Sequence, residues 1–79
     1  MTYAFRALFI EMTSFSYARG GLCVDAKGIN DGLLRCYSVD PTRVIKFKDR
    51  AETLGFSTTM VTVEPGWHSV AIRDVETPK

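Results

Sequence analysis

The segment DPTRVIKFKDRAETLG, residues 40–55, decides the fold because it carries a complete set of helix signals. Asp40 offers an N-cap oxygen, and Pro41 has a φ angle already suited to the first helical position. Gly55 suits the C′ position that ends a helix. Between these limits, apolar residues recur at helical spacing: Val44, Phe47, Ala51 and Leu54, with Ile45 widening the stripe. The segment therefore predicts an amphipathic helix that covers a core.

Two hairpins flank this helix. Before it, residues 21–26 and 33–39 have the composition of strands, and the loop between them contains two glycines and an Asn-Asp pair. After it, residues 57–63 and 67–75 are rich in Thr, Val and Ile, and the turn Glu64-Pro65-Gly66 separates them. The order of elements predicts antiparallel pairing within each hairpin.

The first segment, residues 3–11, is compatible with two structures. Phe5, Leu8, Phe9 and Met12 have helical spacing, but the segment is also apolar at both strand parities, as in a strand buried on both faces. We prefer the strand. The predicted fold is then a single compact α+β domain over residues 1–79, in the order strand-strand-strand-helix-strand-strand. One antiparallel sheet of about five strands would carry one helix on one face.

Composition and charge exclude several classes of protein. The chain has 79 residues, 46% hydrophobic and 24% charged, which argues for one folded domain and against disorder. Ten Lys and Arg against nine Asp and Glu leave a net charge of +1, too small for a histone-like coat. The apolar run Leu8–Ile10 is too short for a membrane span or a signal peptide. We expect a cytoplasmic protein without membrane contact.

The two cysteines are predicted to lie in the first hairpin. If its centre falls between Ile29 and Asn30, Cys23 stands directly opposite Cys36, so a disulfide and two reduced thiols are both open. A reducing compartment favours reduced thiols. The spacing of the cysteines and the single histidine, His68, do not form a zinc motif. We expect no metal and no cofactor.

Catalytic motifs are weakly supported. His68 would be the general base of a hydrolase or nuclease, yet no GxSxG motif or diagnostic carboxylate accompanies it. Gly20-Gly21 lacks the third glycine and the Lys-Ser/Thr ending of a phosphate loop. We therefore predict no catalytic residues and expect that the protein is not an enzyme.

Two basic or aromatic features are candidates for partner binding. Arg43, Lys46 and Arg50 share one ridge of the predicted helix and would pair with phosphates or an acidic patch, unless the ridge is an ordinary solvated face. The segment 15–21 places Phe15, Tyr17 and Arg19 before flexible glycines. These residue types anchor interfaces and stack on bases, although a half-buried strand extension would give the same pattern.

Size favours a function carried by the surface. A chain this small has area for an interface of about 800 Å² but little interior for a deep pocket. We expect a non-catalytic protein that binds and inhibits a larger macromolecular complex. The alternative is a small nucleic-acid-binding or antitoxin-like regulatory module that uses the basic helix face. Monomer and homodimer are both open.

In its size, and in lacking enzyme motifs over the whole chain, the protein resembles small phage-encoded inhibitors of the anti-CRISPR type. The resemblance implies a partner that is a protein or ribonucleoprotein complex of a bacterial host, in particular a CRISPR effector, and a location in the host cytosol. Direct nucleic-acid binding is possible but not favoured. Many such inhibitors present acidic patches, whereas the most organised charged face here is basic. No stretch of residues carries the resemblance, and no binding residue follows from it.

Overall fold

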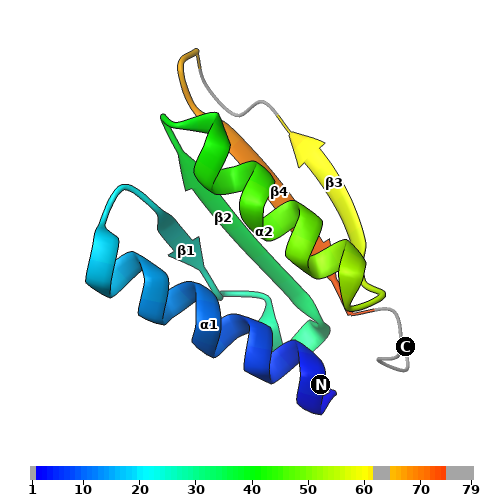
Figure 1. Ribbon diagram of the computed structural model, residues 1–79. Coiled ribbons are helices and arrows are strands. Elements are labelled where there is room, and N and C mark those ends of the chain that lie inside the picture. Colours follow the sequence, from blue (N-terminus) through cyan, green and yellow to red (C-terminus); the bar gives the residue numbers. More distant parts are fainter. Residues whose placement is uncertain (1, 62–64, 75–79) are drawn as a thin grey trace.

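The computed structural model describes residues 2–61 and 65–74, and over these residues the fold is α+β with one antiparallel sheet (Figure 1). Its four strands and two helices follow the order helix, hairpin, helix, hairpin, with a short 3₁₀ helix inside the first hairpin. The elements are α1 (Tyr3–Arg19), β1 (Cys23–Asp25), η1 (Ile29–Asp31), β2 (Leu33–Ser38), α2 (Pro41–Thr53), β3 (Ser57–Val61) and β4 (His68–Arg73).

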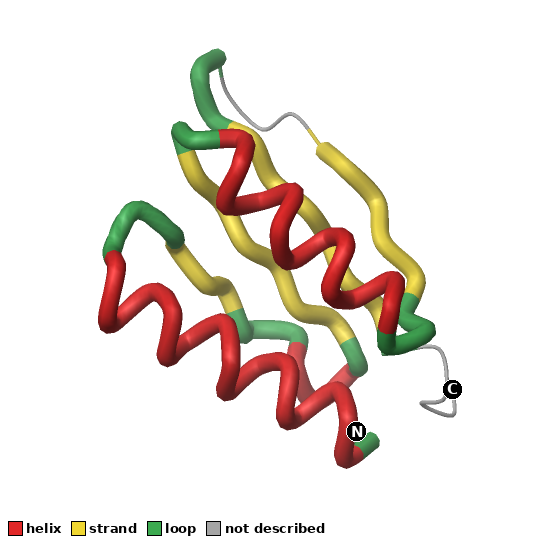
Figure 2. Tube along the Cα trace, in the orientation of Figure 1, coloured by secondary structure: helices red, strands yellow, loops and turns green. Residues whose placement is uncertain are grey.

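The sheet has strand order β1-β2-β4-β3, so the second strand of each hairpin lies in the centre. The two central strands, β2 and β4, pair from Leu33↔Arg73 to Ser38↔His68. Both helices lie on the same face of the sheet and run in opposite directions along it (Figures 1 and 2). The fold therefore consists of two helix–hairpin units, although no repeat is visible in the sequence.

The N-terminal segment is a helix, so the prediction of a first strand was wrong. Within residues 2–61 and 65–74 the sheet has four strands instead of about five, and it carries two helices instead of one. Phe5, Leu8 and Met12 are fully buried, whereas Tyr3 and Ile10 are exposed, so the segment is apolar on both faces but buried on only one. The Thr2 hydroxyl caps α1 by accepting from the Phe5 amide at 3.2 Å. Helical spacing of the large side chains thus decides the structure over strand propensity.

Residues 15–21 are not a single loop, because α1 continues to Arg19 and the chain reverses only after it. Residues 15–19 continue the helix, and Gly20 and Gly21 then take φ angles of 70° and 73°. Side chains with a Cβ rarely adopt this region, so the glycine pair reverses the chain into β1. The Ser16 hydroxyl donates to the Leu22 carbonyl and fastens this reversal to the helix.

The first hairpin differs by one residue from the predicted register. Cys23 pairs with Tyr37 and Val24 pairs with Cys36, because the connection contains the η1 turn and ends at Gly32 with a φ of 77°. A shift of one residue moves side chains to the opposite face. Cys23 is therefore exposed while Cys36 is buried, and both are free thiols. The two side chains therefore lie on opposite faces of the sheet, which corrects the predicted pairing.

The second half of the chain agrees closely with the predicted elements. The Asp40 carboxylate accepts from the Thr42 amide at 3.0 Å and caps α2, and Gly55 follows its end with a φ of 93°. Ile45 and Leu54 are exceptions, since both are exposed rather than part of the buried stripe. The predicted strand residues 62–63 and 75, and Glu64 of the turn, lie outside the described residues.

The core fills the space between the sheet and the two helices. The α1 residues Phe5, Leu8 and Met12 meet Val44, Phe47 and Ala51 of α2 over Leu34, Cys36, Val70 and Ile72 of the central strands. Phe5 also packs edge-on against Phe56, with ring centroids 5.2 Å apart. All of this apolar packing lies on the helix side of the sheet. No helix in residues 2–61 or 65–74 is both long and apolar enough to cross a membrane.

Candidate binding surface

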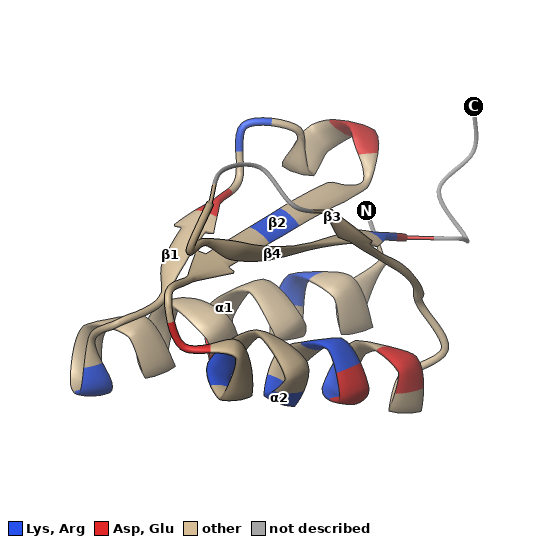
Figure 3. Ribbon diagram, turned by 90° about the horizontal axis from the view of Figure 1, so that it is seen from above, with Lys and Arg blue, Asp and Glu red and all other residues tan. Residues whose placement is uncertain are grey.

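The face of the sheet opposite the helices is the candidate binding surface, and we call it the open face. Seen from above in Figure 3, both helices lie below the sheet, and the strands' other face is not covered by either of them. Successive residues of a strand point to opposite faces of the sheet, so the residues that alternate with the buried ones point toward the open face. The outward residues on the two central strands are Leu33, Arg35 and Tyr37 of β2, and Ser69, Ala71 and Arg73 of β4.

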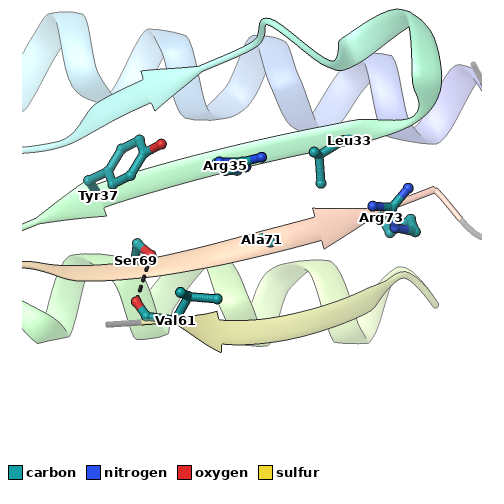
Figure 4. Close-up of a pocket in the computed structure, with 7 residues that line it drawn as sticks. All are labelled: Leu33, Arg35, Tyr37, Val61, Ser69, Ala71 and Arg73. Atoms are coloured by element: carbon teal, nitrogen blue, oxygen red, sulfur yellow. Dashed lines mark hydrogen bonds between the residues drawn. The ribbon is translucent and has the colours of Figure 1, made fainter. Parts of the chain in front are cut away.

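A shallow hollow of about 310 Å³ lies on the open face (Figure 4). Its floor is formed by two small residues of β4, Ser69 and Ala71. The larger side chains around it are Leu33, Arg35, Tyr37, Val61 and Arg73. Because small residues lie at the centre of the sheet and longer side chains surround them, a protruding group of a partner can approach the backbone there.

A second hollow of about 340 Å³ adjoins the first, because Leu33 and Arg35 line both. Asp25, Lys27 and Gly28 complete its lining. The two hollows together carry the cations Lys27, Arg35 and Arg73 and one acidic residue, Asp25. The open face is therefore positively charged, although the whole chain is nearly neutral.

Asp25 stays ionised at neutral pH and organises the β1 side of this face. The Lys27 amide donates to one carboxylate oxygen at 3.0 Å, and the Tyr37 hydroxyl donates to the other at 3.2 Å. These hydrogen bonds, led by that of Lys27, lower the pKa of Asp25 against a smaller effect of burial. Asp25 also pairs with Arg35 in the strand register. Tyr37 is thereby held in place by a carboxylate rather than free to rotate.

The predicted ridge Arg43, Lys46 and Arg50 is on α2, but its cations are engaged within the protein. The Arg50 Nε lies 3.2 Å from a Glu11 carboxylate oxygen, which joins α2 to α1. The Arg43 Nε lies 3.7 Å from an Asp40 oxygen, and its guanidinium stands 5.8 Å from the Phe15 ring centre. Lys46 stands over the rings of Phe15 and Phe47. The ridge therefore already has intramolecular partners.

The predicted aromatic segment is divided between different surroundings. Phe15 is half-buried between the helices and packs against Phe47 at 5.3 Å between ring centres. Tyr17 is 96% exposed, and Arg19 is exposed in the last turn of α1. Phe15 thus meets Arg43 and Lys46, but as part of the packed structure. Tyr17 does not join them on a common surface.

The remaining candidates for chemistry do not converge. Cys36 is fully buried, and its burial raises the pKa of the thiol to about 12. His68 is half-buried at the start of β4, opposite Ser38. Within the described part of the chain, no three His, Cys, Asp or Glu side chains lie together in a way that would hold a metal ion.

Comparison with known proteins identifies no relative of this chain. The chain matches no family model, no curated protein and no solved structure. The function is therefore inferred from the open face itself.

Sequence reasoning missed Arg35, although a signal for it was present. Between Leu33 and Ser38, apolar Leu34 and Cys36 alternate with Arg35 and Tyr37, which predicts one buried and one exposed face. Arg73 likewise alternates with Ile72. What the sequence did not show is that the two exposed faces become one surface, because this depends on β2 pairing with β4.

Proposed function

We propose that this protein is a non-catalytic interaction protein that docks its open face on an anionic surface of a larger protein complex and blocks it. The observation that carries the proposal is the absence of either helix from this face, which presents Arg35, Arg73 and Lys27 together with Tyr37. Arginine and tyrosine are enriched among the residues that contribute most to binding. The hollows are shallow and open, so they suit docking better than the turnover of a small substrate.

The composition of the open face favours a protein partner over single-stranded nucleic acid. Sheets that bind RNA commonly stack two or three bases on aromatic side chains. Across the two hollows, Tyr37 is the aromatic residue, and its hydroxyl is held by Asp25. Leu33, Val61 and Ala71 supply aliphatic contact beside the arginines, a mixture typical of protein interfaces. Nucleic-acid binding through Arg35 and Tyr37 is the second candidate.

The resemblance to anti-CRISPR inhibitors supplies the first partner to test. It implies a CRISPR effector complex in the cytosol of a bacterial host. Acidic side chains of an effector subunit would meet the open face directly, in contrast to inhibitors that mimic nucleic acid with acidic patches. The helix ridge is the competing surface, and the two surfaces are distinguishable by mutation.

The experiment compares two variants with the same change in charge. Arg35→Gln with Arg73→Glu alters the open face, and Arg43→Gln with Lys46→Glu alters the helix ridge. Arg35 is replaced by Gln rather than Glu because Asp25 lies opposite Arg35 in the strand register, where a second carboxylate would be repelled. Each tagged protein is incubated with purified effector complexes and assayed for capture and for inhibition of target cleavage. We expect the open-face variant to lose both and the ridge variant to retain both, with circular dichroism showing that each variant is folded at the assay temperature.

A titration separates the two candidate partners. Labelled single- and double-stranded DNA and RNA are added to the protein at low salt, where phosphate contacts bind most strongly. We expect no strong binding. Nanomolar affinity that Arg35→Gln with Arg73→Glu abolishes would instead support the nucleic-acid module, and retention of effector capture by that variant would exclude the open face.

A further inference from the structure

Helix α1 carries large apolar side chains on the face that points away from the core. Tyr3, Ile10 and Tyr17 recur every seven residues and are 92%, 56% and 96% exposed. Residues seven apart lie on one side of a helix, with a drift of about 20°. The buried residues Phe5, Leu8 and Met12 lie on the other side. We call this exposed side the outer stripe. It comprises Tyr3, Arg6, Ala7, Ile10, Thr13, Ser14 and Tyr17.

The outer stripe is unusually poor in charge for a surface helix. A helix that packs on one side of a soluble domain normally has a polar opposite face. Between Tyr3 and Tyr17 the stripe contains Arg6, Ala7, Thr13 and Ser14 beside Ile10. Glu11 projects from the flank of α1, where it forms the ion pair with Arg50. The stripe therefore combines one charged residue with three large exposed side chains, a composition that favours contact with another chain.

We propose that a second copy of this chain covers the outer stripe, in a two-fold dimer with the α1 helices antiparallel and the axis at Ile10. In this arrangement Ile10 meets its own counterpart, and Tyr3 of each copy meets Tyr17 of the other. A two-fold interface requires a surface that is complementary to itself. The spacing of the three residues is symmetric about Ile10, which satisfies that requirement.

Charge decides between antiparallel and parallel packing. Parallel helices would place Arg6 beside Arg6 of the second copy in an apolar contact, which is unfavourable. In the antiparallel arrangement Arg6 lies opposite Ser14, eight positions from the other Arg6. Eight residues correspond to about 12 Å along a helix axis. The antiparallel dimer therefore avoids the repulsion.

Shape agrees with the same arrangement. A shallow apolar hollow of about 310 Å³ on α1 is lined by Phe9, Ile10, Thr13, Ser14 and Tyr17. The antiparallel pairing brings Tyr3 of the second copy, which is 92% exposed, onto this hollow. The small residues Ala7 and Ser14 beside Ile10 allow the helix backbones to approach each other.

The area is sufficient for a weak but specific dimer. A tyrosine ring and its stem bury about 200 Å², so Tyr3 and Tyr17 from both copies together remove about 800 Å² from water. Ile10 and the small residues of both helices bring the total toward the lower limit of specific interfaces, about 1,200 Å². We expect a dissociation constant in the micromolar range. Since α1 lies below the sheet, the dimer leaves both open faces accessible and is independent of the proposed function.

The first test is the solution mass as a function of concentration. Sedimentation equilibrium of the wild-type protein is expected to show a reversible change from one chain mass to twice that mass. Ile10→Asp places a charge on the two-fold axis and is expected to leave only monomer. Ile45→Asp is the matched control, because Ile45 is 45% exposed on α2 and lies outside the stripe. A monomer at every concentration, or a dimer that survives Ile10→Asp, would overturn the proposal.

Cross-linking tests the direction of the helices. Cys23→Ser removes the exposed thiol, and Tyr3→Cys or Tyr17→Cys then introduces one on the stripe. A short bismaleimide is expected to link the two variants when they are mixed, and to link neither variant to itself. Equal linking of Tyr3→Cys with itself would show parallel helices and contradict the arrangement.

Discussion

Phe15 of α1 meets Phe47 of α2 edge to face, with ring centres 5.3 Å apart and planes at 80°. This contact joins the two helices on the underside of the sheet. Lys46 stands over both rings, at 5.8 Å from the Phe15 centre and 5.7 Å from that of Phe47. Phe15 therefore serves the stability of the domain, and its availability for stacking on a partner is limited.

The first prediction is an energetic coupling between these two rings. In a double-mutant cycle with Phe15→Leu and Phe47→Leu, we expect a coupling of about 0.5–1.5 kcal/mol, since edge-to-face pairs contribute that much beyond their buried area. Urea unfolding of the four proteins measures it. Phe15→Leu combined with Phe56→Leu is the control, because Phe56 packs on Phe5 instead and the two effects should add. A coupling near zero in the first cycle would show that the rings do not interact.

The second prediction concerns the acid limb of the stability curve. Hydrogen bonds from the side chain and the backbone amide of Thr42 hold the pKa of Asp40 below its ordinary value of 3.8. A carboxyl with a lowered folded-state pKa stabilises the fold above the unfolded-state value, and this contribution is lost as pH falls through the folded-state value. Asp40→Asn keeps a capping oxygen but cannot titrate.

We therefore expect the wild-type protein to be more stable than Asp40→Asn at neutral pH and the difference to shrink as pH falls below 3.8. Thermal midpoints measured from pH 7 to pH 2 test this. A difference that stays constant over the whole range would mean that the charge of Asp40 makes no contribution.

The third prediction is that the two thiols differ in reactivity. Cys23 is exposed, whereas Cys36 is buried with a pKa raised to about 12, and only the thiolate is an effective nucleophile. One thiol per chain should react rapidly with a disulfide reagent at neutral pH, and the second only at the rate of unfolding. Cys23→Ser should remove the rapid phase. Two rapid thiols in the wild-type protein would contradict the burial of Cys36.

The same thiol affects stability at alkaline pH. The unfolded chain loses the Cys36 proton near the ordinary value of 9.0, whereas the folded chain keeps it until about 12. In that interval the folded state binds more protons, so Cys36 lowers the free energy of unfolding as pH rises. Cys36→Ala should therefore flatten the fall in stability across this interval.

The sequence was sufficient for elements with strong local signals. Asp40-Pro41 and Gly55 set the limits of α2, and the alternation of Val70 and Ile72 with Ala71 and Arg73 placed the two faces of β4. Such signals depend on a few neighbouring residues and survive any tertiary arrangement. The open face of the sheet, in contrast, combines residues about 35 positions apart, and only the β2–β4 pairing brings them together.

The N-terminal segment was predicted wrongly because its outer face is apolar. The strand interpretation assumed that apolar residues at both parities are buried, yet Tyr3, Ile10 and Tyr17 are exposed on α1. If a second copy covers them, the pattern of α1 contains two interfaces, one with the sheet and one between chains. The periodicity of one chain does not distinguish these two interfaces, because both require apolar residues at helical spacing.

The fourth prediction tests how α1 is fixed to the sheet. Asp74, which is 3% exposed, follows β4, and its carboxylate accepts from the Thr2 amide at 2.8 Å. A carboxylate at a helix N-terminus also interacts favourably with the helix dipole. Because a hydrogen bond to a charged group contributes about 1.5–3 kcal/mol, Asp74→Ala should lower the free energy of unfolding by an amount in that range. Asp74→Asn keeps an acceptor without the charge and should lose roughly half as much.

Urea unfolding with far-UV circular dichroism measures these losses and shows whether the helices remain formed. Asp49→Ala provides the matched control, because Asp49 is exposed on α2 and its replacement should change stability by at most about 0.5 kcal/mol. If Asp74→Ala were no more destabilising than Asp49→Ala, the contact with Thr2 would not hold the start of α1. We expect Asp74→Ala to show both a loss of stability and faster hydrogen exchange at the first turns of α1, because the Thr2 amide no longer donates to Asp74.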